Sequence, residues 1–287
     1  MDDVNLLFWP GSLNARGFEA IIREAAAGAF AELAISPLMI HELLATGRTA
    51  DDIIAEAAAR GVRLSTLDGV SSWAPIWIQD NPLPAMRARF AFTAAQNLEM
   101  AAALGLDTIL VAGAFDKGAL DLEVLIDPFG RFCDEAARLG IRVELEFVPF
   151  WGIPELGVAW DIVRRAARPN SGLLIDTWHF HKGSRDIEAD LALLATIPGD
   201  RLRNVQLADA LARSEADTLY AQGRLRRHAG DGELAIDRIV GTIVQQGCLE
   251  RIGPEIFGAV ADDALPGETG RRGASTTRQV LGRAFNA

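Results

Sequence analysis

Short apolar segments alternate along the chain with alanine-rich segments that carry polar residues at helical spacing. The apolar segments are rich in Val, Ile and Leu without strict alternation, which is typical of strands buried on both faces of a parallel sheet. Eight strands are predicted, over residues 4–9, 30–35, 62–67, 108–112, 141–148, 172–177, 202–207 and 251–257.

A helix is predicted after each strand. Gly61, Gly140 and Gly247 each follow a helical segment, and glycine in this position commonly ends a helix. The longest predicted loop covers residues 68–84. The predicted helices cover residues 18–27, 50–60, a long segment up to 104, 128–139, 155–167, 187–197, 235–246 and 276–284.

Eight strand–helix units in order predict a parallel sheet closed into a single (β/α)8 TIM barrel. The alternative is an open, doubly wound sheet, which usually has a glycine-rich phosphate loop after its first strand. The residues there are Trp9, Pro10, Gly11 and Ser12, which contain neither a GxGxxG nor a Walker pattern. No linker divides the chain, so residues 1–287 are interpreted as one barrel domain.

Composition narrows the classes of function. The chain has 287 residues, is 49% hydrophobic and carries a net charge of -11, which argues against a nucleic-acid partner because phosphate contacts need clustered cations. No apolar run approaches the length of a membrane span, so no membrane partner is expected. The acidic amino terminus lacks a signal pattern, and Cys133 and Cys248 lack ligand-like spacing. We therefore expect a cytoplasmic protein with reduced thiols.

Four consecutive strands have a polar residue near their carboxyl ends: Glu146, Asp176, Gln206 and Glu255. Successive members of the first three lie 30 residues apart. Strand carboxyl ends meet at one face of a barrel, so these side chains are predicted to converge on one pocket. Three carboxylates and an amide oxygen suit one divalent metal ion, with Mg²⁺ or Mn²⁺ favoured over Zn²⁺.

Each of these residues also has an ordinary structural explanation. Glu144 points to the same face as Glu146 and is the alternative pocket residue, or the buried partner of an arginine. Asp176 could serve as a helix N-cap, which is a common role for Asp after a strand. Glu255 lies in an otherwise apolar segment, where an unpaired carboxylate is costly.

The segments ELEF (144–147), IDTWH (175–179), VQLAD (205–209) and GPEIF (253–257) together resemble the xylose isomerase-like TIM barrel superfamily, which includes sugar phosphate isomerases and epimerases. The resemblance covers essentially the whole chain. It implies that Glu146, Asp176, Gln206 and Glu255 bind one metal ion. Better-known epimerases have His where this chain has Gln206, and Gln there is similar to some 3-dehydroshikimate dehydratases.

The resemblance also implies the chemistry. A divalent metal polarises the carbonyl of a keto substrate, and two carboxylates remove and return the neighbouring proton by way of an enediolate. Glu146 and Glu255 are the predicted acid–base pair. His179 would bind a substrate oxygen or relay a proton, or else would only cap the loop after strand six.

The segment RLRRHAGDGE (224–233) resembles the family pattern R-x-x-P-G-x-G, with Ala229 in place of Pro. By that match Arg226 would contact a substrate hydroxyl or carboxylate and His228 would assist. The alternative is a solvated basic turn before a helix.

Tryptophans gather in predicted loops after strands, and a pocket walled by them would favour a substrate with a ring. The substrate-binding candidates among them are Trp9, Trp73, Trp151 and Trp178. No glycine-rich cradle follows strands seven or eight, which argues against a phosphate group on the substrate.

The predicted function is therefore a metal-dependent isomerase or epimerase of a small sugar or polyol-type keto compound. The first alternative is a lyase, acting as a 3-dehydroshikimate or inosose dehydratase or by β-elimination on a keto-glycoside. A repair endonuclease would need a basic face and more histidines, and a non-catalytic ligand-binding barrel would bind no metal. A homodimer is the starting expectation for the assembly.

Overall fold

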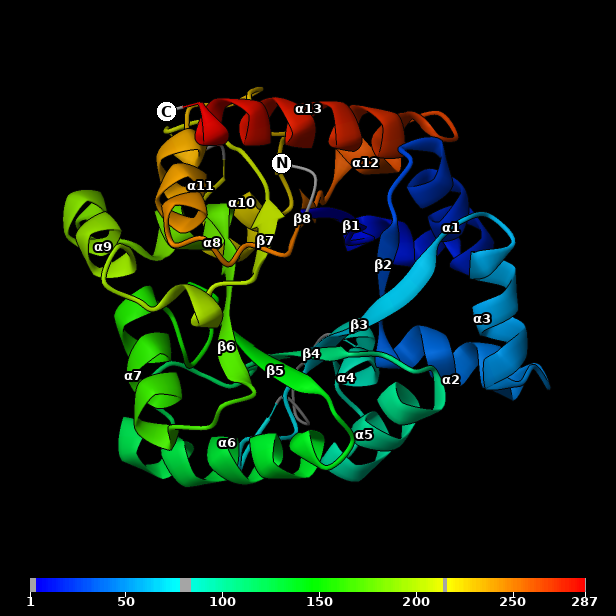
Figure 1. Cartoon of the computed structure of the whole chain (residues 1–287), viewed down its shortest axis with the longest axis horizontal. Helices are drawn as coiled ribbons and strands as arrows, with labels where there is room; N and C mark the ends of the chain where they lie inside the picture. The colour runs from blue at the N-terminus through cyan, green and yellow to red at the C-terminus, as the bar shows by residue number, and fades with distance from the viewer. Residues whose placement is uncertain (1–3, 78–83, 214–215, 287) are drawn as a thin grey trace.

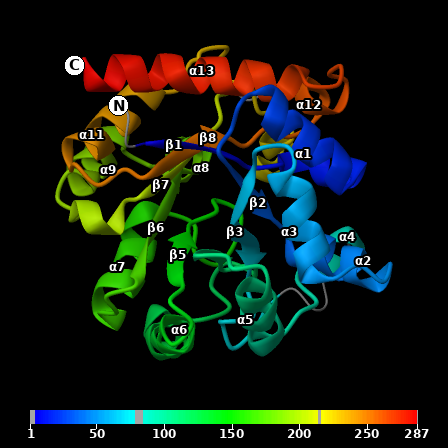
Figure 2. The same ribbon diagram turned by 45° about the vertical axis from the view of Figure 1, so that its right-hand side comes forward.

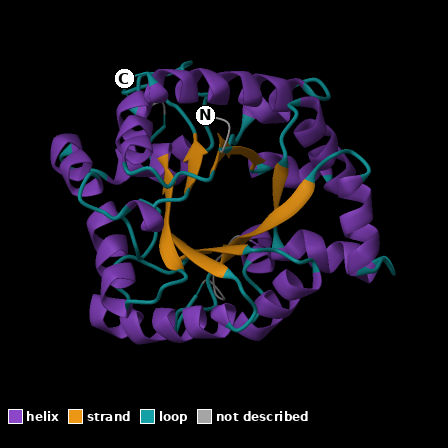
Figure 3. Cartoon of the chain, viewed as in Figure 1, coloured by secondary structure: helices purple, strands orange, loops and turns teal. Residues whose placement is uncertain are grey.

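A computed structural model describes residues 4–77, 84–213 and 216–286. Eight parallel strands form a closed barrel in sequence order, so the predicted (β/α)8 TIM barrel is confirmed. Figure 3 shows the closed ring of strands inside a ring of helices. The strands are β1 Asn5–Phe8, β2 Glu32–Ile35, β3 Arg63–Val70, β4 Thr108–Ala112, β5 Arg142–Glu146, β6 Ser171–Asp176, β7 Asn204–Leu207 and β8 Arg251–Pro254.

Helices cover the outside of the barrel, with further short helices in the loops (Figure 1). The larger ones are α1 Phe18–Ala27, α2 Pro37–Ala45, α3 Ala50–Ala58, α5 Ala94–Ala103, α6 Leu122–Ala137, α7 Leu156–Ala166, α9 Ile187–Leu194, α11 Ile236–Gln245 and α13 Glu268–Phe285. The shorter ones are the 3₁₀ helices Gly11–Arg16 and Gly199–Arg201, with α4 Pro84–Arg89, α8 Thr177–Gly183, α10 Leu219–Gly223 and α12 Ala259–Asp262. Within the described residues, no helix is both long and apolar enough to cross a membrane.

The barrel interior has a thin apolar layer. Leu7, Ala34, Leu110 and Leu174 are buried there with Trp9 and form a cluster separate from the larger core. The larger core lies between the strands and the helices, where outward-facing strand residues pack against helix side chains. Strand residues alternate between these two regions because successive side chains point to opposite faces.

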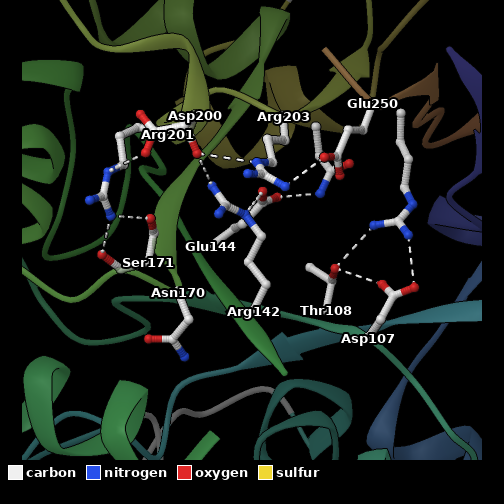
Figure 4. A network of polar contacts seen from close by, with 12 residues as sticks. Asp107, Thr108, Arg142, Glu144, Asn170, Ser171, Asp200, Arg201, Arg203 and Glu250 are labelled. Atoms are coloured by element: carbon white, nitrogen blue, oxygen red, sulfur yellow. Dashed lines mark hydrogen bonds and ion pairs between the residues drawn. The ribbon is translucent and has the colours of Figure 1, made fainter. Parts of the chain in front are cut away.

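A buried polar network closes the amino-terminal end of the barrel. Arg251 of β8 donates to Glu32 at 2.6 Å, to Thr108 at 3.1 Å and to Asp107 at 2.8 Å. Glu144 is fully buried and belongs to the same end of the barrel, where Figure 4 shows the surrounding contacts. In TIM barrels this face generally contributes to stability, whereas the loops that form active sites lie at the opposite face.

Two helices, α6 and α13, start well before their predicted first residues. Helix α6 begins at Leu122 and contains Pro128, which was predicted as its start. Helix α13 begins at Glu268. Its first turns are polar and glycine-rich, so they lack the apolar periodicity by which the other helices were predicted. The glycines there permit close packing: a Cβ at Gly270 would lie 1.8 Å from the carbonyl oxygen of Glu24. Gly270 thus lets α13 pack against α1, and Gly273, where a Cβ would lie 2.6 Å from the Pro254 side chain, lets it pack against β8. Figures 1 and 2 show α13 along the outside of the barrel.

Candidate active site

The side chains predicted to bind a metal lie at the carboxyl-terminal end of the barrel and are buried. Asp176 and Gln206 are fully buried, and Glu146 and Glu255 are 8% and 6% exposed. Strand β8 ends at Pro254, so Glu255 directly follows the strand and is held there by a parallel bridge to Trp9.

Helix α8 starts at the residue after β6, so Asp176 is both a strand end and a helix N-cap. Its Oδ1 accepts a hydrogen bond from the backbone N–H of His179 at 2.6 Å. The N-cap role considered for Asp176 in the sequence analysis is confirmed. It leaves Oδ2 of Asp176 available for the contact with Arg226. The cap also places His179 one helical turn beyond the strand, next to the carboxylates.

His179 is buried among ionisable groups. Its Nδ1 lies 2.9 Å from Oε1 of Glu146, outside hydrogen-bonding geometry, and 3.8 Å from Oδ1 of Asp176. Burial, together with the nearby Arg226, lowers the pKa of His179 to about 4 against the opposing effects of Asp176 and Glu255. The imidazole is therefore neutral at pH 7.

Arg226 is the principal cation of the cluster. Its Nη1 donates to Oδ2 of Asp176 at 2.7 Å and to Oε2 of Glu255 at 2.8 Å. Its Nη2 lies 2.8 Å from Nε2 of His179. The guanidinium carbon is 5.1 Å from the ring centres of both Trp178 and Phe257. The segment that carries Arg226 therefore belongs to the buried site, and the alternative of a solvated basic turn is wrong for this residue.

Asp209 holds the segment that presents Arg226. Its carboxylate accepts hydrogen bonds from four backbone N–H groups, those of Ala210, Gly230, Gly232 and Leu234, at 2.8–3.1 Å. Asp209 also pairs through its backbone with Arg227, the neighbour of Arg226. A single buried carboxylate after β7 thus fixes the loop that crosses over the strand ends.

Gln206 contacts two predicted site residues. In the amide orientation that satisfies both partners, its nitrogen donates to Oε1 of Glu146 at 3.1 Å and its oxygen accepts from Nε1 of Trp9 at 3.3 Å. In this orientation the oxygen is engaged by Trp9. The role of Gln206 as a metal ligand therefore requires the amide to turn over.

The carboxyl groups of the two predicted acid–base residues have raised pKa values. Burial raises the pKa of Glu146 well above its ordinary value, and Asp176 and Asp68 raise it further. Burial raises the pKa of Glu255 to about 8, against the lowering effect of Arg226. Both shifts favour the protonated carboxyl group, which is the form that a general acid needs, and for Glu255 that form persists near neutral pH.

Asp68 is a member of the cluster that the sequence analysis missed. It is 5% exposed near the end of β3, interacts electrostatically with Glu146 and Glu255, and accepts from Arg89 at 3.2 Å. The signal was present, because Asp68 directly follows the predicted third strand. It was assigned to a loop, whereas β3 continues to Val70.

The charge of this cluster suits a divalent cation. Among the described residues it contains four carboxylates and two guanidinium groups, so two negative charges are in excess when all are ionised. Glu146, Asp176 and His179 each offer one ligand atom, and these atoms lie within 4.8 Å of one another. Glu255 and Gln206 are the further predicted donors. The residues present therefore fit an oxygen-rich divalent site.

The two remaining tryptophans predicted to bind substrate, Trp151 and Trp73, lie in different surroundings. Trp151 belongs to an aromatic wall, since its ring centre lies 5.5 Å from that of Phe150, which is 6.3 Å from the ring of His179. Trp73 packs edge-on against Phe129 of α6 and donates to the carbonyl of Ala112, which places it between barrel and helices.

His228 is buried away from the carboxylates. The charged groups that act on it are Arg272, Asp231 and Glu268, and burial lowers its pKa to about 4. Among the described residues, none of the charged groups that act on His228 belongs to the cluster at the strand ends. Its predicted role in substrate binding stays a prediction.

The sequence matches the family of xylose isomerase-like TIM barrels over residues 13–278. The 3-dehydroshikimate dehydratases of Pseudomonas putida and Pseudomonas aeruginosa are each 29% identical over 157 residues, which is 54% of this chain and 24% of each relative. An inosose isomerase of Bacillus licheniformis is 26% identical over 175 residues, 59% of this chain and 58% of the relative. The chain thus aligns with only about a quarter of the length of the dehydratases.

Solved structures share the fold at low sequence identity. The IOLI protein with a bound zinc atom superimposes with a TM-score of 0.81 at 17% identity, covering 99% of this chain and 100% of that one. D-psicose 3-epimerase of Clostridium cellulolyticum H10, with D-tagatose, superimposes with a TM-score of 0.65 at 14% identity, covering 99% of both chains.

Proposed function

This chain belongs to the xylose isomerase-like TIM barrel family, and we propose from this premise that it is a divalent-metal-dependent isomerase or epimerase. The proposed substrate is a sugar or polyol-type keto compound, and the proposed reaction is proton transfer through an enediolate. One observation carries the proposal. Glu146 and Glu255 are both buried in one acidic cluster, and burial raises the pKa of both carboxyl groups above the ordinary value.

The two glutamates have complementary roles in this reaction. One accepts the proton next to the substrate carbonyl, and the other returns a proton to the resulting enediolate. A raised pKa favours the protonated form of each carboxyl group, so each group can donate a proton as well as accept one. When bound, a divalent ion would supply Lewis-acid polarisation of the carbonyl and would balance the excess negative charge. Its proposed ligands are Glu146, Asp176, Gln206 and Glu255.

The aromatic wall next to His179 limits what fits the pocket. Phe150 contacts the rings of Trp151, Tyr220 and His179, with centre separations of 5.5–6.3 Å. Such a wall offers flat apolar surfaces to the C–H face of a ring and excludes water from the reacting carbon. This supports a cyclic substrate in place of a small phosphorylated one.

A lyase is the second candidate, and the match to two 3-dehydroshikimate dehydratases favours it. The same proton abstraction leads to loss of water if the enediolate carries a hydroxyl at the β-carbon. A ring carboxylate on such a substrate needs a cationic partner. Arg226 is already bonded to two carboxylates, whereas the side chain of Arg89 is 25% exposed and pairs, among the described residues, with Asp68.

The experiment that tests the proposal follows the substrate α-proton in D₂O. Chelator-treated protein is supplied with Mg²⁺, Mn²⁺ or Zn²⁺ and incubated separately with ketohexoses, inososes and 3-dehydroshikimate. Deuterium entry with a new stereoisomer or aldose supports the isomerase or epimerase. Formation of an aromatic product from 3-dehydroshikimate supports the lyase instead.

Variants test the assigned roles. Glu146→Gln and Glu255→Gln are each expected to abolish formation of the new stereoisomer, because that reaction needs both proton-transfer groups. Glu250→Gln is the matched control, since Glu250 forms a partly exposed ion pair with Arg203 at the opposite end of the barrel. Formation of the stereoisomer at the wild-type rate by either site variant would contradict the acid–base assignment, and activity that is unaffected by chelation would contradict the metal requirement.

A further inference from the structure

Arg226 occupies the place where the carboxylates of β6 and β8 meet. A single nitrogen, Nη1, lies 2.7 Å from Oδ2 of Asp176 and 2.8 Å from Oε2 of Glu255. A divalent ion that bridged these two oxygens would lie about 2.1 Å from each, in the space that this nitrogen fills. The positive charge of the guanidinium also opposes any second cation in the cluster.

The contact between Arg226 and His179 restricts the same site in a second way. A guanidinium has only donors, so Nη2 donates to Nε2 of His179 across their 2.8 Å separation. The neutral imidazole must then carry its proton on Nδ1. Nδ1 is the atom that lies near Glu146 and Asp176, and a protonated nitrogen cannot ligate a metal.

The slot around the guanidinium shows that this position is well defined. Trp178 and Phe257 each lie with ring centres 5.1 Å from the guanidinium carbon, and Arg226 is only 2% exposed. The two aromatic faces hold the planar cation by cation–π attraction. Because Nη1 and Nη2 make all three contacts, displacement of the guanidinium would release both carboxylates and the imidazole together.

We propose that Arg226 and the divalent ion are mutually exclusive partners of Asp176 and Glu255, so that the guanidinium is the counter-ion of the metal-free protein and metal binding displaces it. This inference rests on the proposed function, because that function supplies the metal. Displacement frees Nε2 of His179, moves the imidazole proton from Nδ1 to Nε2, and lets Nδ1 face the ion. The metal affinity of this chain is therefore set by competition within the protein.

The first test compares metal affinities. Chelator-treated wild type, Arg226→Gln and Arg89→Gln are titrated with Mn²⁺ in a calorimeter at one pH. Arg226→Gln is expected to bind Mn²⁺ about tenfold tighter or more than the wild type, because the competitor is gone. Arg89→Gln is the matched control. It removes one positive charge next to Asp68 without touching Asp176 or Glu255, and it should tighten binding by about threefold or less.

The second test is read on the wild-type protein, and a variant serves only to assign the signals. The ring nitrogens of His179 are followed by ¹⁵N NMR in the wild type, which has four histidines, and are assigned with His179→Gln. Addition of Mg²⁺ is expected to exchange the protonated and unprotonated nitrogens of this ring. Metal binding with an unchanged tautomer, or with equal affinity in the wild type and Arg226→Gln, would overturn the inference while leaving the proposed function intact. Binding of no metal by either protein would overturn both.

Discussion

Two glutamates of β5, two residues apart, are expected to respond in opposite directions to the same substitution. Glu144 and Glu146 point to the same side of the strand, into the barrel, but they face different environments. Glu144 accepts from Nε of Arg142 at 2.9 Å and from Nδ2 of Asn204 at 2.6 Å. Burial instead raises the pKa of Glu146 well above the ordinary value, and the neighbouring carboxylates of Asp176 and Asp68 raise it further.

The magnitudes follow from these contacts. Glu144→Gln turns an amide nitrogen toward one of two donors and leaves the partly buried Arg142 without its carboxylate, so the free energy of unfolding should fall by about 2 to 4 kcal/mol. Glu146→Gln removes a carboxylate that is costly to ionise in the metal-free fold, and the free energy of unfolding should rise by about 1 kcal/mol at pH 7.

The pH dependence of the second effect has a definite sign. A carboxyl group whose folded pKa is raised contributes its full stability below its unfolded pKa and loses that contribution as the pH rises through the folded value. The advantage of Glu146→Gln should therefore vanish near pH 4 and grow toward neutral pH. Added Mg²⁺ should reverse it, because the ion stabilises only a protein that retains the carboxylate.

The assay is urea unfolding of the metal-free wild type and both variants, followed by circular dichroism at pH 4 and pH 7 and repeated with Mg²⁺. If Glu146→Gln is destabilising at pH 7 without metal, the description of Glu146 as an uncompensated buried acid is wrong. If Glu144→Gln is neutral, the polar network at the amino-terminal end contributes less than its geometry indicates. Opposite signs at pH 7 would support both assignments.

Three further predictions concern other parts of the fold. Asp209→Asn should lower the free energy of unfolding in urea by about 3 kcal/mol, because an amide cannot accept all four backbone N–H groups. The control is Asp231→Asn on the same loop, which breaks one surface ion pair and should lower the free energy of unfolding by less than about 1 kcal/mol. Burial lowers the pKa of His228 to about 4, so the free energy of unfolding should fall by up to about 3 kcal/mol as the pH is lowered from 6.5 to 4. The decline should be flatter in His228→Gln, and equal declines in the wild type and this variant would contradict the assignment to His228. Gly253→Ala places a Cβ 1.7 Å from a backbone carbonyl oxygen of β1 and should lower thermal stability severely, by more than about 3 kcal/mol, whereas Gly241→Ala meets no atom within 4 Å and should not.

The barrel and the set of acidic strand ends were predictable from the sequence because both depend on local pattern. Apolar runs of strand length between helical segments specify a parallel sheet, and a polar residue that closes such a run must lie at the carboxyl edge. Glu146, Asp176 and Gln206 were found in this way. Asp68 escaped because the prediction ended strand three at residue 67, while β3 continues through Gly69 to Val70.

The contacts of Arg226 could not be obtained from local pattern, because they join positions 50 and 29 residues apart in the chain. The sequence shows an arginine in a basic turn, and such a turn is as consistent with solvent as with a pocket. What decides between them is Asp209, whose four hydrogen bonds fold the turn over the strand ends. Once the turn is so placed, a buried guanidinium must find carboxylates, and the nearest ones are the predicted ligands of the metal. The residue that was expected to bind substrate therefore pairs with two carboxylates of the proposed metal site.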